Sequence, residues 1–271
     1  MKMTDRNNTP IAEKGVVEQV RKISGSVWDM TIHSPAIAGA SRAGQFVHVR
    51  VSDGFNPFLR RPLSVGPCRG DYLRLIFVVK GVGTRLLAGK HPGDIIDMIG
   101  PLGNPFPAPE TDQYPILVAG GIGMVPLLLM DNQFVNSIDH DFLLGMRSSA
   151  HQTVDDVEIK RLKIVIASDD GSIGYHGTVI DLLENRLTEL KRRKIVVYGC
   201  GPVPMLQSLK EVCVSRSIPA YISLEVSMGC GVGACQSCAV PRADGDGYYL
   251  VCRDGPAFRA SAVDLNAGGR S

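Results

Sequence analysis

Three cysteines fall within nine positions in the stretch "MGCGVGACQSCAV" (residues 228–240), and a fourth follows in "YYLVCRDGPAF". The spacing is C-x4-C-x2-C-x13-C over Cys230, Cys235, Cys238 and Cys252. Zinc sites usually take their ligands from two C-x2-C pairs, whereas C-x4-C-x2-C with a distant fourth cysteine is the plant-type arrangement for a 2Fe-2S cluster. The spacing therefore predicts a 2Fe-2S cluster, with a structural zinc site as the alternative.

Glycines separate the first two of these cysteines, at Gly231 and Gly233. A loop that wraps an inorganic core must turn its backbone N–H groups toward the sulfurs, and bulky side chains would hold the backbone away. The glycines thus agree with a loop closed around a cluster.

A second set of residues could bind a phosphate. "RRPLSV" (residues 60–65) ends a predicted strand with a guanidinium and a hydroxyl, and "KGVGT" (residues 80–84) follows another strand with glycines. Arginine can hold a pyrophosphate in a bidentate way, and a glycine-rich turn offers backbone N–H groups to an anion. A surface arginine before a proline turn and an ordinary glycine hairpin are the alternatives.

A third signal is "VAGGIGMVPLL", in which a buried strand ends at Gly120, Gly121 and Gly123 and a helix begins. The start of a helix presents N–H groups and the positive end of its dipole to a phosphate. The stretch is not G-x-G-x-x-G, so it lacks the standard dinucleotide fingerprint. A tight strand-to-helix turn without a ligand is the alternative.

Two later strand ends favour binding of NAD(H). "IASDDGS" places Asp169 and Asp170, and "YGCGPVPML" places Cys200, Gly201 and Pro202, at the carboxyl ends of strands, where doubly wound sheets bind ligands. We expect Cys200 to line the nicotinamide pocket without covalent chemistry; a catalytic thiol and a small filler are the alternatives. An acidic pair facing the ribose would disfavour a 2′-phosphate and hence NADPH.

The elements that must position these residues follow three different patterns. Short runs with period-two alternation, as in "GQFVHVRV", predict an antiparallel β-barrel over residues 1–108. Strands such as "PILVAG" and "KIVVYG" alternate with helical stretches and predict a doubly wound parallel sheet over residues 109–222. Residues 223–271 hold the four clustered cysteines and show little regular pattern. A segment this small needs a cross-link, such as a bound metal centre, to be stable. The predicted class is multi-domain β plus α/β.

Composition narrows the classes of function. The chain has 271 residues, a formal charge of +2 and no run of basic residues, so nucleic acid is a poor candidate partner. The uncharged stretch 114–130 is shorter than the roughly 20 residues of a membrane span and is interrupted by glycine and proline, so we expect no membrane contact. The first ten residues lack the apolar core of an export signal, and we expect a cytoplasmic protein.

Taken together, the barrel with "RRPLSV", the sheet with "AGGIG" and "YGCGP", and the C-terminal "CGVGACQSC" and "VCRDGPAF" resemble one known family. That family is the electron-transfer subunit of the NAD-dependent class (1B) of dihydroorotate dehydrogenase, within the ferredoxin reductase superfamily. The resemblance covers nearly the whole chain after the first dozen residues. It implies an oxidoreductase subunit with FAD in the barrel, NAD(H) on the sheet and a 2Fe-2S cluster held by the four cysteines.

The resemblance also assigns FAD contacts. The family's R-P-x-S stretch binds FAD, and many members of the superfamily carry an aromatic residue where this chain has leucine. A glycine and threonine hold the pyrophosphate, and the end of the preceding strand lies along the cofactor. In this sequence these positions are Arg61, Pro62, Leu63, Ser64, Phe77, Val78, Val79, Gly83 and Thr84.

The mechanism implied by the resemblance converts a two-electron donor into single electrons. NADH passes a hydride to the flavin, and single electrons leave through the cluster to a separate FMN-containing catalytic subunit of dihydroorotate dehydrogenase. The two kinds of subunit are expected to form a heterotetramer that acts in pyrimidine biosynthesis. No acid or base of this chain is expected to be catalytic. Two alternatives stay open: an NAD(P)H-ferredoxin-type or hydrogenase-associated reductase with another partner, and a nucleotide-binding module with structural zinc.

Overall fold

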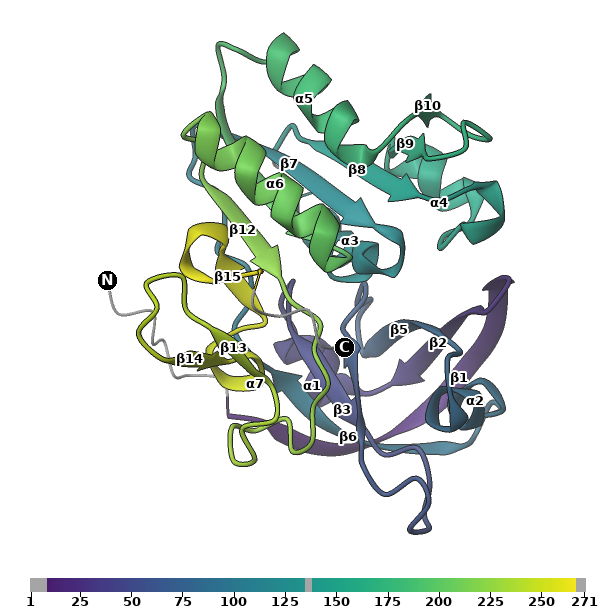
Figure 1. Ribbon diagram of the computed structural model, residues 1–271. Coiled ribbons are helices and arrows are strands. Elements are labelled where there is room, and N and C mark those ends of the chain that lie inside the picture. The colour runs from purple at the N-terminus through teal and green to yellow at the C-terminus, as the bar shows by residue number, and fades with distance from the viewer. Residues whose placement is uncertain (1–8, 135–137, 267–271) are drawn as a thin grey trace.

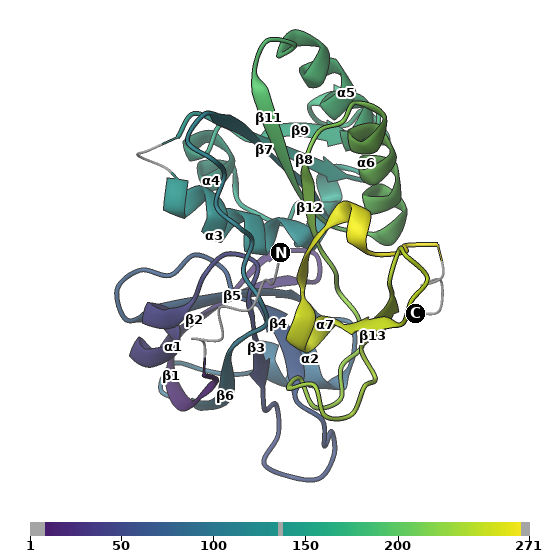
Figure 2. The same ribbon diagram turned by 90° about the vertical axis from the view of Figure 1, so that its left-hand side faces the viewer.

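The computed structural model describes residues 9–134 and 138–266 of the chain. An antiparallel sheet, coloured purple to blue, lies below a mostly parallel sheet in teal and green, and the yellow C-terminal segment lies beside both (Figure 1). Rotation by 90° shows the same arrangement from the side (Figure 2).

The antiparallel sheet has six strands in the order β4-β3-β6-β1-β2-β5. Its edge strands β4 and β5 contact each other, so the sheet is a nearly closed barrel, as the alternation predicts. The strands are β1 (Ile11–Ser24), β2 (Val27–His33), β3 (Phe46–Val49), β4 (Arg61–Ser64), β5 (Tyr72–Val78) and β6 (Ile95–Leu102). Two short helices, α1 (Pro35–Ala40) and α2 (Val82–Ala88), connect strands of the barrel.

Strand β3 is buried on both faces. Val47 and Val49 belong to the core of the barrel, whereas Phe46 packs with residues of the C-terminal segment. Because adjacent residues of a strand point to opposite faces, the C-terminal segment covers the outer face of β3. This is the face on which His48 also lies.

The second sheet has seven strands in the order β10-β9-β8-β7-β11-β12-β15, all parallel except the last pair. Helix α3 (Met124–Phe134) covers one face, and α5 (Val179–Glu189) and α6 (Val203–Ser215) cover the other, while α4 (Asp156–Arg161) precedes β9. The strands are β7 (Gln113–Gly120), β8 (Asp141–Met146), β9 (Val165–Ser168), β10 (Tyr175–His176), β11 (Lys194–Cys200), β12 (Ala220–Ser223) and β15 (Ala257–Arg259).

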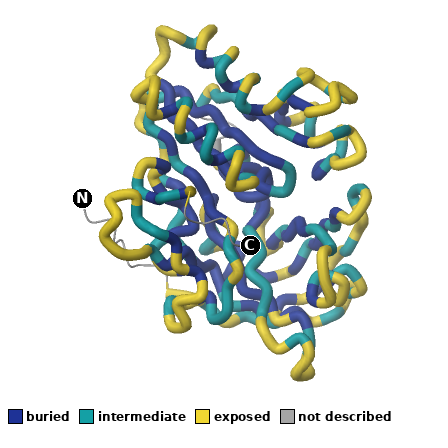
Figure 3. The backbone as a smooth tube through the Cα atoms, in the orientation of Figure 1, coloured by how far each residue is buried: buried dark blue, intermediate teal, exposed yellow. Residues whose placement is uncertain are grey.

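Strand β7 shows why this sheet is wound on both faces. Leu117 and Ala119 pack into the core shared by α3 and the barrel, and Ile116 and Val118 pack into the core with α5 and α6. A near-continuous apolar strand is typical of a parallel sheet covered on both sides. Figure 3 shows that the strands inside both sheets are buried (dark blue) and that the loop tips are exposed (yellow).

The uncharged stretch 114–130 forms a strand, a short 3-10 turn (Gly121–Gly123) and helix α3. Within the described residues, no helix combines the length and apolar character needed to cross a bilayer.

The C-terminal segment contains β13 (Ala239–Pro241), β14 (Tyr248–Leu250) and α7 (Val251–Asp254) before β15. Strand β15 pairs antiparallel with β12 and so completes the edge of the parallel sheet. The segment therefore contacts the barrel through β3 and the α/β region through β12, although its sequence shows little regular pattern.

Candidate functional site

The four cysteines of the C-x4-C-x2-C-x13-C pattern come together in two pairs. Cys230 and Cys235 lie in the loop after β12, Cys238 directly precedes β13, and Cys252 lies in α7. The backbone N–H of each of the first two donates to the sulfur of the other, at 3.3 and 3.4 Å. The sulfurs of Cys238 and Cys252 lie 3.3 Å apart.

Backbone N–H groups of the loop point at the sulfurs, as the glycines predict. The sulfur of Cys230 accepts from Val232 and Ala234, and that of Cys252 accepts from Gly233 at 3.1 Å. Gly233 has a φ of +85°, in the left-handed region that glycine adopts without strain. The loop therefore supplies the donors that stabilise anionic sulfur.

The two pairs differ in exposure. Cys238 and Cys252 are buried, and burial raises the pKa of Cys252 to about 12. Cys235 is exposed, and the hydrogen bond with the Ser237 side chain is the main reason that its pKa is lowered to about 6. One side of the site thus faces the core and the other faces solvent.

This donor set fits a two-iron centre. A tetrahedral zinc site needs four ligands around one ion, whereas each iron of a 2Fe-2S cluster takes two protein ligands. Two sulfur pairs with inward N–H donors provide the ligands that two irons need.

The barrel brings Arg61 beside the glycine turn that precedes and opens α2. A Cβ atom on Gly83 would lie 2.8 Å from Nε of Arg61, so the glycine lets the guanidinium pack directly against the turn. Among the described residues, Arg61 donates to the main-chain carbonyls of Leu59 and Arg60 and makes no ion pair with a carboxylate. A cation without a carboxylate partner next to a glycine turn suits a phosphate.

The other expected FAD residues line the same part of the barrel. All four residues of β4 are half-buried, and this edge strand includes Pro62, which an edge tolerates. Phe77 is buried at the end of β5, and Val78 and Val79 follow it half-buried. The hydroxyl of Thr84 accepts from the N–H of Lys80 and Gly81 and so fixes the turn. The structure brings these residues together; their contacts with FAD stay predictions.

The glycines after β7 are required by the meeting of two strand ends. A Cβ atom on Gly123 would lie 2.4 Å from the carbonyl oxygen of Cys200, and one on Gly120 would lie 2.7 Å from Pro202. Gly201 is constrained in the same way by Gly120. This packing accounts for Gly120, Gly123 and Gly201 without a ligand, whereas Gly121 has open space around it and a φ of +52°. The role of these glycines in NAD binding stays a prediction.

The other expected NAD residues differ in accessibility. Asp169 and Asp170 are exposed in the turn after β9. Cys200 is fully buried, which raises the pKa of its thiol well above its ordinary value. Its side chain therefore lies inside the protein at the end of β11, and its proposed place beside the nicotinamide stays a prediction.

Glu225 links the two predicted binding regions, and sequence reasoning missed it. Its side chain is exposed, yet enough protein surrounds it to raise the pKa of its carboxyl, with Lys80 acting in the opposite direction. Glu225 in turn contributes to the raised pKa of Cys200. The charge of Glu225 thus acts on the end of β11, and Lys80, at the start of the glycine turn in the barrel, acts on Glu225. A lone glutamate after a strand carries no sequence signal for this.

His48 is the second residue that sequence reasoning missed. It is buried on β3, where desolvation and the Arg60 guanidinium lower its pKa, while the backbone of Cys230 acts in the opposite direction. Neither ring nitrogen has a hydrogen-bond partner among the described residues. The signal available in the sequence was one polar residue in "GQFVHVRV" at a position that alternation alone would expose.

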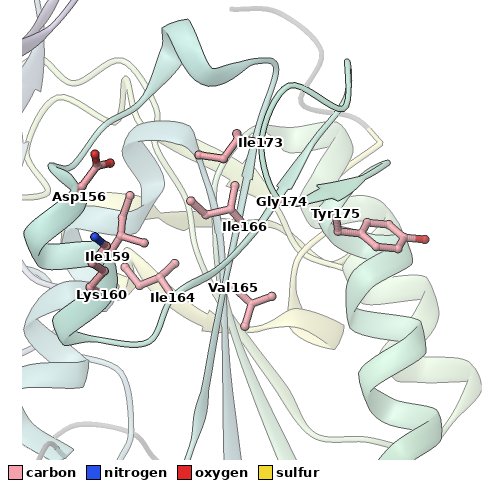
Figure 4. A pocket seen from close by; sticks show the side chains of 9 residues that line it. All are labelled: Asp156, Ile159, Lys160, Ile164, Val165, Ile166, Ile173, Gly174 and Tyr175. Carbon is pink, nitrogen blue, oxygen red and sulfur yellow. The ribbon is translucent and has the colours of Figure 1, made fainter.

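A separate pocket of about 600 Å³ lies at the edge of the parallel sheet, between α4 and strands β9 and β10 (Figure 4). Isoleucines dominate its lining, and Tyr175 points away from them toward α5. It contains none of the residues that the sequence singles out for cofactor binding.

Comparison with known proteins gives a consistent result. The model of the iron-sulfur cluster binding domain of dihydroorotate dehydrogenase B matches residues 225–264. The chain is 40% identical to the electron transfer subunit of dihydroorotate dehydrogenase B (NAD(+)) from Geobacillus kaustophilus, over 93% of this chain and 98% of that protein. Identity to the subunit of the same name from Desulforamulus reducens is 36%, over 88% of this chain and 93% of that protein.

Solved structures share the fold. The NADH-dependent reduced ferredoxin-NADP oxidoreductase, described in connection with flavin-based electron bifurcation, superimposes with a TM-score of 0.81 at 29% identity, over 93% of this chain and 90% of that one. The ferredoxin reductase in carbazole 1,9a-dioxygenase gives a TM-score of 0.65 at 18% identity, over 79% of this chain and 69% of that one.

Proposed function

The chain belongs to the family of electron transfer subunits of NAD-dependent dihydroorotate dehydrogenase B, and from this membership we propose that it delivers electrons to, or takes them from, an FMN-containing catalytic subunit. It is an oxidoreductase subunit whose cofactors are FAD, a 2Fe-2S cluster and NAD(H). The observation that carries the proposal is that the four cysteines of the C-terminal segment, which packs on the barrel, come together as two pairs.

The cofactors supply the redox chemistry: FAD exchanges the two electrons of a hydride with NAD(H), and a 2Fe-2S cluster passes single electrons. The protein binds and orients them. Arg61 and the turn at Gly83 would hold the pyrophosphate of FAD, and the carboxyl ends of β7, β9 and β11 would receive NAD(H). The four cysteines would hold the irons, with the Cys235 side open toward solvent.

A partner subunit is implied by the name that the relatives carry. That this partner contains FMN, that the assembly is a heterotetramer and that it serves pyrimidine biosynthesis in the cytoplasm are parts of the proposal. A cytoplasmic location agrees with the cluster, because a reducing compartment keeps cysteines as free thiols, and free thiols rather than disulfides bind iron. The exposed side of the cluster loop gives electrons a short route to such a partner.

A second candidate has a specific observation in its favour. The high structural similarity to an NADH-dependent ferredoxin-NADP oxidoreductase extends over most of both chains. The same domains could therefore serve a reductase with another partner, while the sulfur pairs disfavour a nucleotide-binding module with structural zinc.

Co-purification tests the proposal. The tagged chain, expressed in its source cells, is expected to co-purify with a subunit that releases FMN on denaturation. The complex is expected to couple the oxidation of NADH to the reduction of orotate. A complex with flavin and 2Fe-2S absorption but without an FMN subunit or orotate turnover would favour the second candidate. A colourless preparation that contains zinc would contradict both.

A further inference from the structure

The structure buries one histidine between the strand assigned to FAD and the loop that carries the first cluster ligand. His48 on β3 is 1% exposed and pairs in register with Pro62 of β4. Its ring also meets the cluster loop, because a Cβ atom on Gly231 would lie 2.7 Å from Nδ1 and 3.1 Å from Cε1. The ring thus touches the loop, and its strand adjoins the strand of the flavin motif.

The polar atoms of this ring are unpaired. Neither Nδ1 nor Nε2 makes a hydrogen bond of normal geometry with a described residue. Buried ring nitrogens are rarely left in that state, because each loses its hydrogen bonds to water on folding. The main chains of Cys230 and Arg60 both lie near the ring and act on it as hydrogen-bond acceptors, with Cys230 the stronger of the two. A small adjustment of the loop would complete the bond with Cys230.

The loop transmits the position of its backbone to the cluster ligand. The sulfur of Cys230 accepts from three N–H groups of the same loop, those of Val232, Ala234 and Cys235. Gly231 adopts a φ of +72°, which brings the loop backbone onto the imidazole. A contact that fixes the main chain at Cys230 therefore also fixes the sulfur and its donors.

We propose that His48 is a positioning residue for the cluster: its Nδ1–H donates to the main-chain carbonyl of Cys230 when the cluster is bound, and its ring holds the cluster loop against the flavin strand. This inference rests on the proposed function, since it takes the four cysteines as ligands of a 2Fe-2S cluster. Residues outside the ligand set commonly orient metal ligands and set the potential of the metal centre.

Substitution of His48 in the full chain, purified with its cofactors, tests the inference. His48→Phe keeps a planar ring, although a larger one, and removes the donor; it is expected to lose iron to EDTA about 10- to 100-fold faster than the wild type. Its cluster is expected to have a more negative midpoint potential, because the N–H dipole no longer stabilises the reduced form, and a changed EPR spectrum. His48→Asn, whose side-chain amide can replace the Nδ1–H, is expected to restore most of each property.

A pair of glycine variants tests the contact from the other side. Gly231 and Gly245 have similar φ values, +72° and +76°, but a Cβ atom on Gly245 would meet nothing within 4 Å. Both changes to alanine strain the backbone alike, and only Gly231→Ala presses on His48. We expect Gly231→Ala to reproduce the faster iron loss and Gly245→Ala to behave as the wild type.

The outcomes separate this inference from the function on which it depends. A wild-type chain without iron or flavin would contradict the proposed function itself. A loaded wild type, together with a His48→Phe variant of unchanged iron retention, potential and EPR spectrum, would overturn the role of His48 and leave the function intact. If His48→Phe does not fold, the decision passes to His48→Asn and the glycine pair, and equal behaviour of Gly231→Ala and Gly245→Ala would overturn the inference.

Discussion

At the scale of single residues, Cys235 is the most exposed of the four cluster cysteines, and its sulfur contacts Ser237 at 3.2 Å. We expect Cys235→Ser to abolish the iron-sulfur absorption while FAD stays bound, because the flavin motif lies on the barrel. Iron content per chain and the visible spectrum give the measurement. Cys68→Ser, which changes a half-buried thiol outside the cluster loop, should keep its iron. Unchanged iron in Cys235→Ser would show that the ligand assignment is wrong.

Arg61 supplies the second prediction at this scale. Its guanidinium packs against Gly83 and has no carboxylate partner among the described residues, so we expect it to pair with the FAD phosphate. Loss of a charge-assisted hydrogen bond costs about 1.5–3 kcal/mol, so Arg61→Ala should weaken FAD affinity roughly 10- to 150-fold. Fluorescence of released flavin on dilution measures the affinity. The exposed Arg69→Ala serves as the control, and equal FAD retention by both variants would count against the role of Arg61.

Residue types and spacing are enough to predict the cluster ligands because the cysteine pattern is local in sequence; the structure brings the four cysteines together in two pairs, and their role as ligands stays a prediction. His48 and Glu225 escaped prediction for the opposite reason. Each takes its environment from a segment far away in the chain: Gly231 lies against His48, and Lys80 lies near Glu225. A single polar residue in a strand reads as solvent-facing until the segment that covers it is known.

At the scale of elements, an ion-pair network joins the barrel to α4. Arg74 on β5 donates to Asp29 on β2 and to Glu158 on α4, at 2.9 Å in both cases. The Glu158 side chain is 10% exposed. Removing one partner of a buried pair leaves an uncompensated charge, which costs about 3–5 kcal/mol.

Glu158→Gln should therefore lower the free energy of unfolding by roughly 3 kcal/mol, near the lower end for breaking a buried pair because the amide keeps one acceptor. Chemical denaturation followed by circular dichroism measures the change. Glu110→Gln is the matched control, since Glu110 pairs with Lys194 at the surface, where such pairs contribute about 0–1 kcal/mol. A loss no larger than that of the control would mean that the network does not hold α4 to the barrel.

Elements with a regular period were predictable. The alternation in β3 and the apolar run of β7 agree with the strands observed, and α5 buries Leu183 and Leu187, four residues apart, on one face. Strand β15 was not predicted, because three residues carry no period. Its pairing with β12 comes from the tertiary packing of the cysteine segment.

At the scale of the whole molecule, the packing of the cysteine segment on both domains limits how the electron path from NADH through FAD to the cluster can be tested. The segment over 223–271 was expected to be a small appendix, and its boundary stays a prediction. Its strand β15 completes the parallel sheet, and its core residues pack on Phe46 of the barrel. Deleting the segment would thus expose apolar surface on both domains and confound loss of the cluster with loss of fold.

A point substitution avoids this problem. Cys230 is half-buried in a loop, whereas Cys252 is buried in α7, so Cys230→Ser is expected to disturb the packing least. If hydride enters at the flavin and electrons leave through the cluster, this variant should keep NADH-driven bleaching of FAD in stopped flow and lose orotate turnover with its partner. The reason is placement: Arg61, Gly83 and the ends of β7 and β11 all precede the segment in the chain. Should flavin reduction fall in step with turnover while FAD content and circular dichroism match the wild type, the cluster loop would be shaping the nicotinamide site. Glu225, whose charge acts on the buried Cys200, would then be the first residue to substitute in search of the cause.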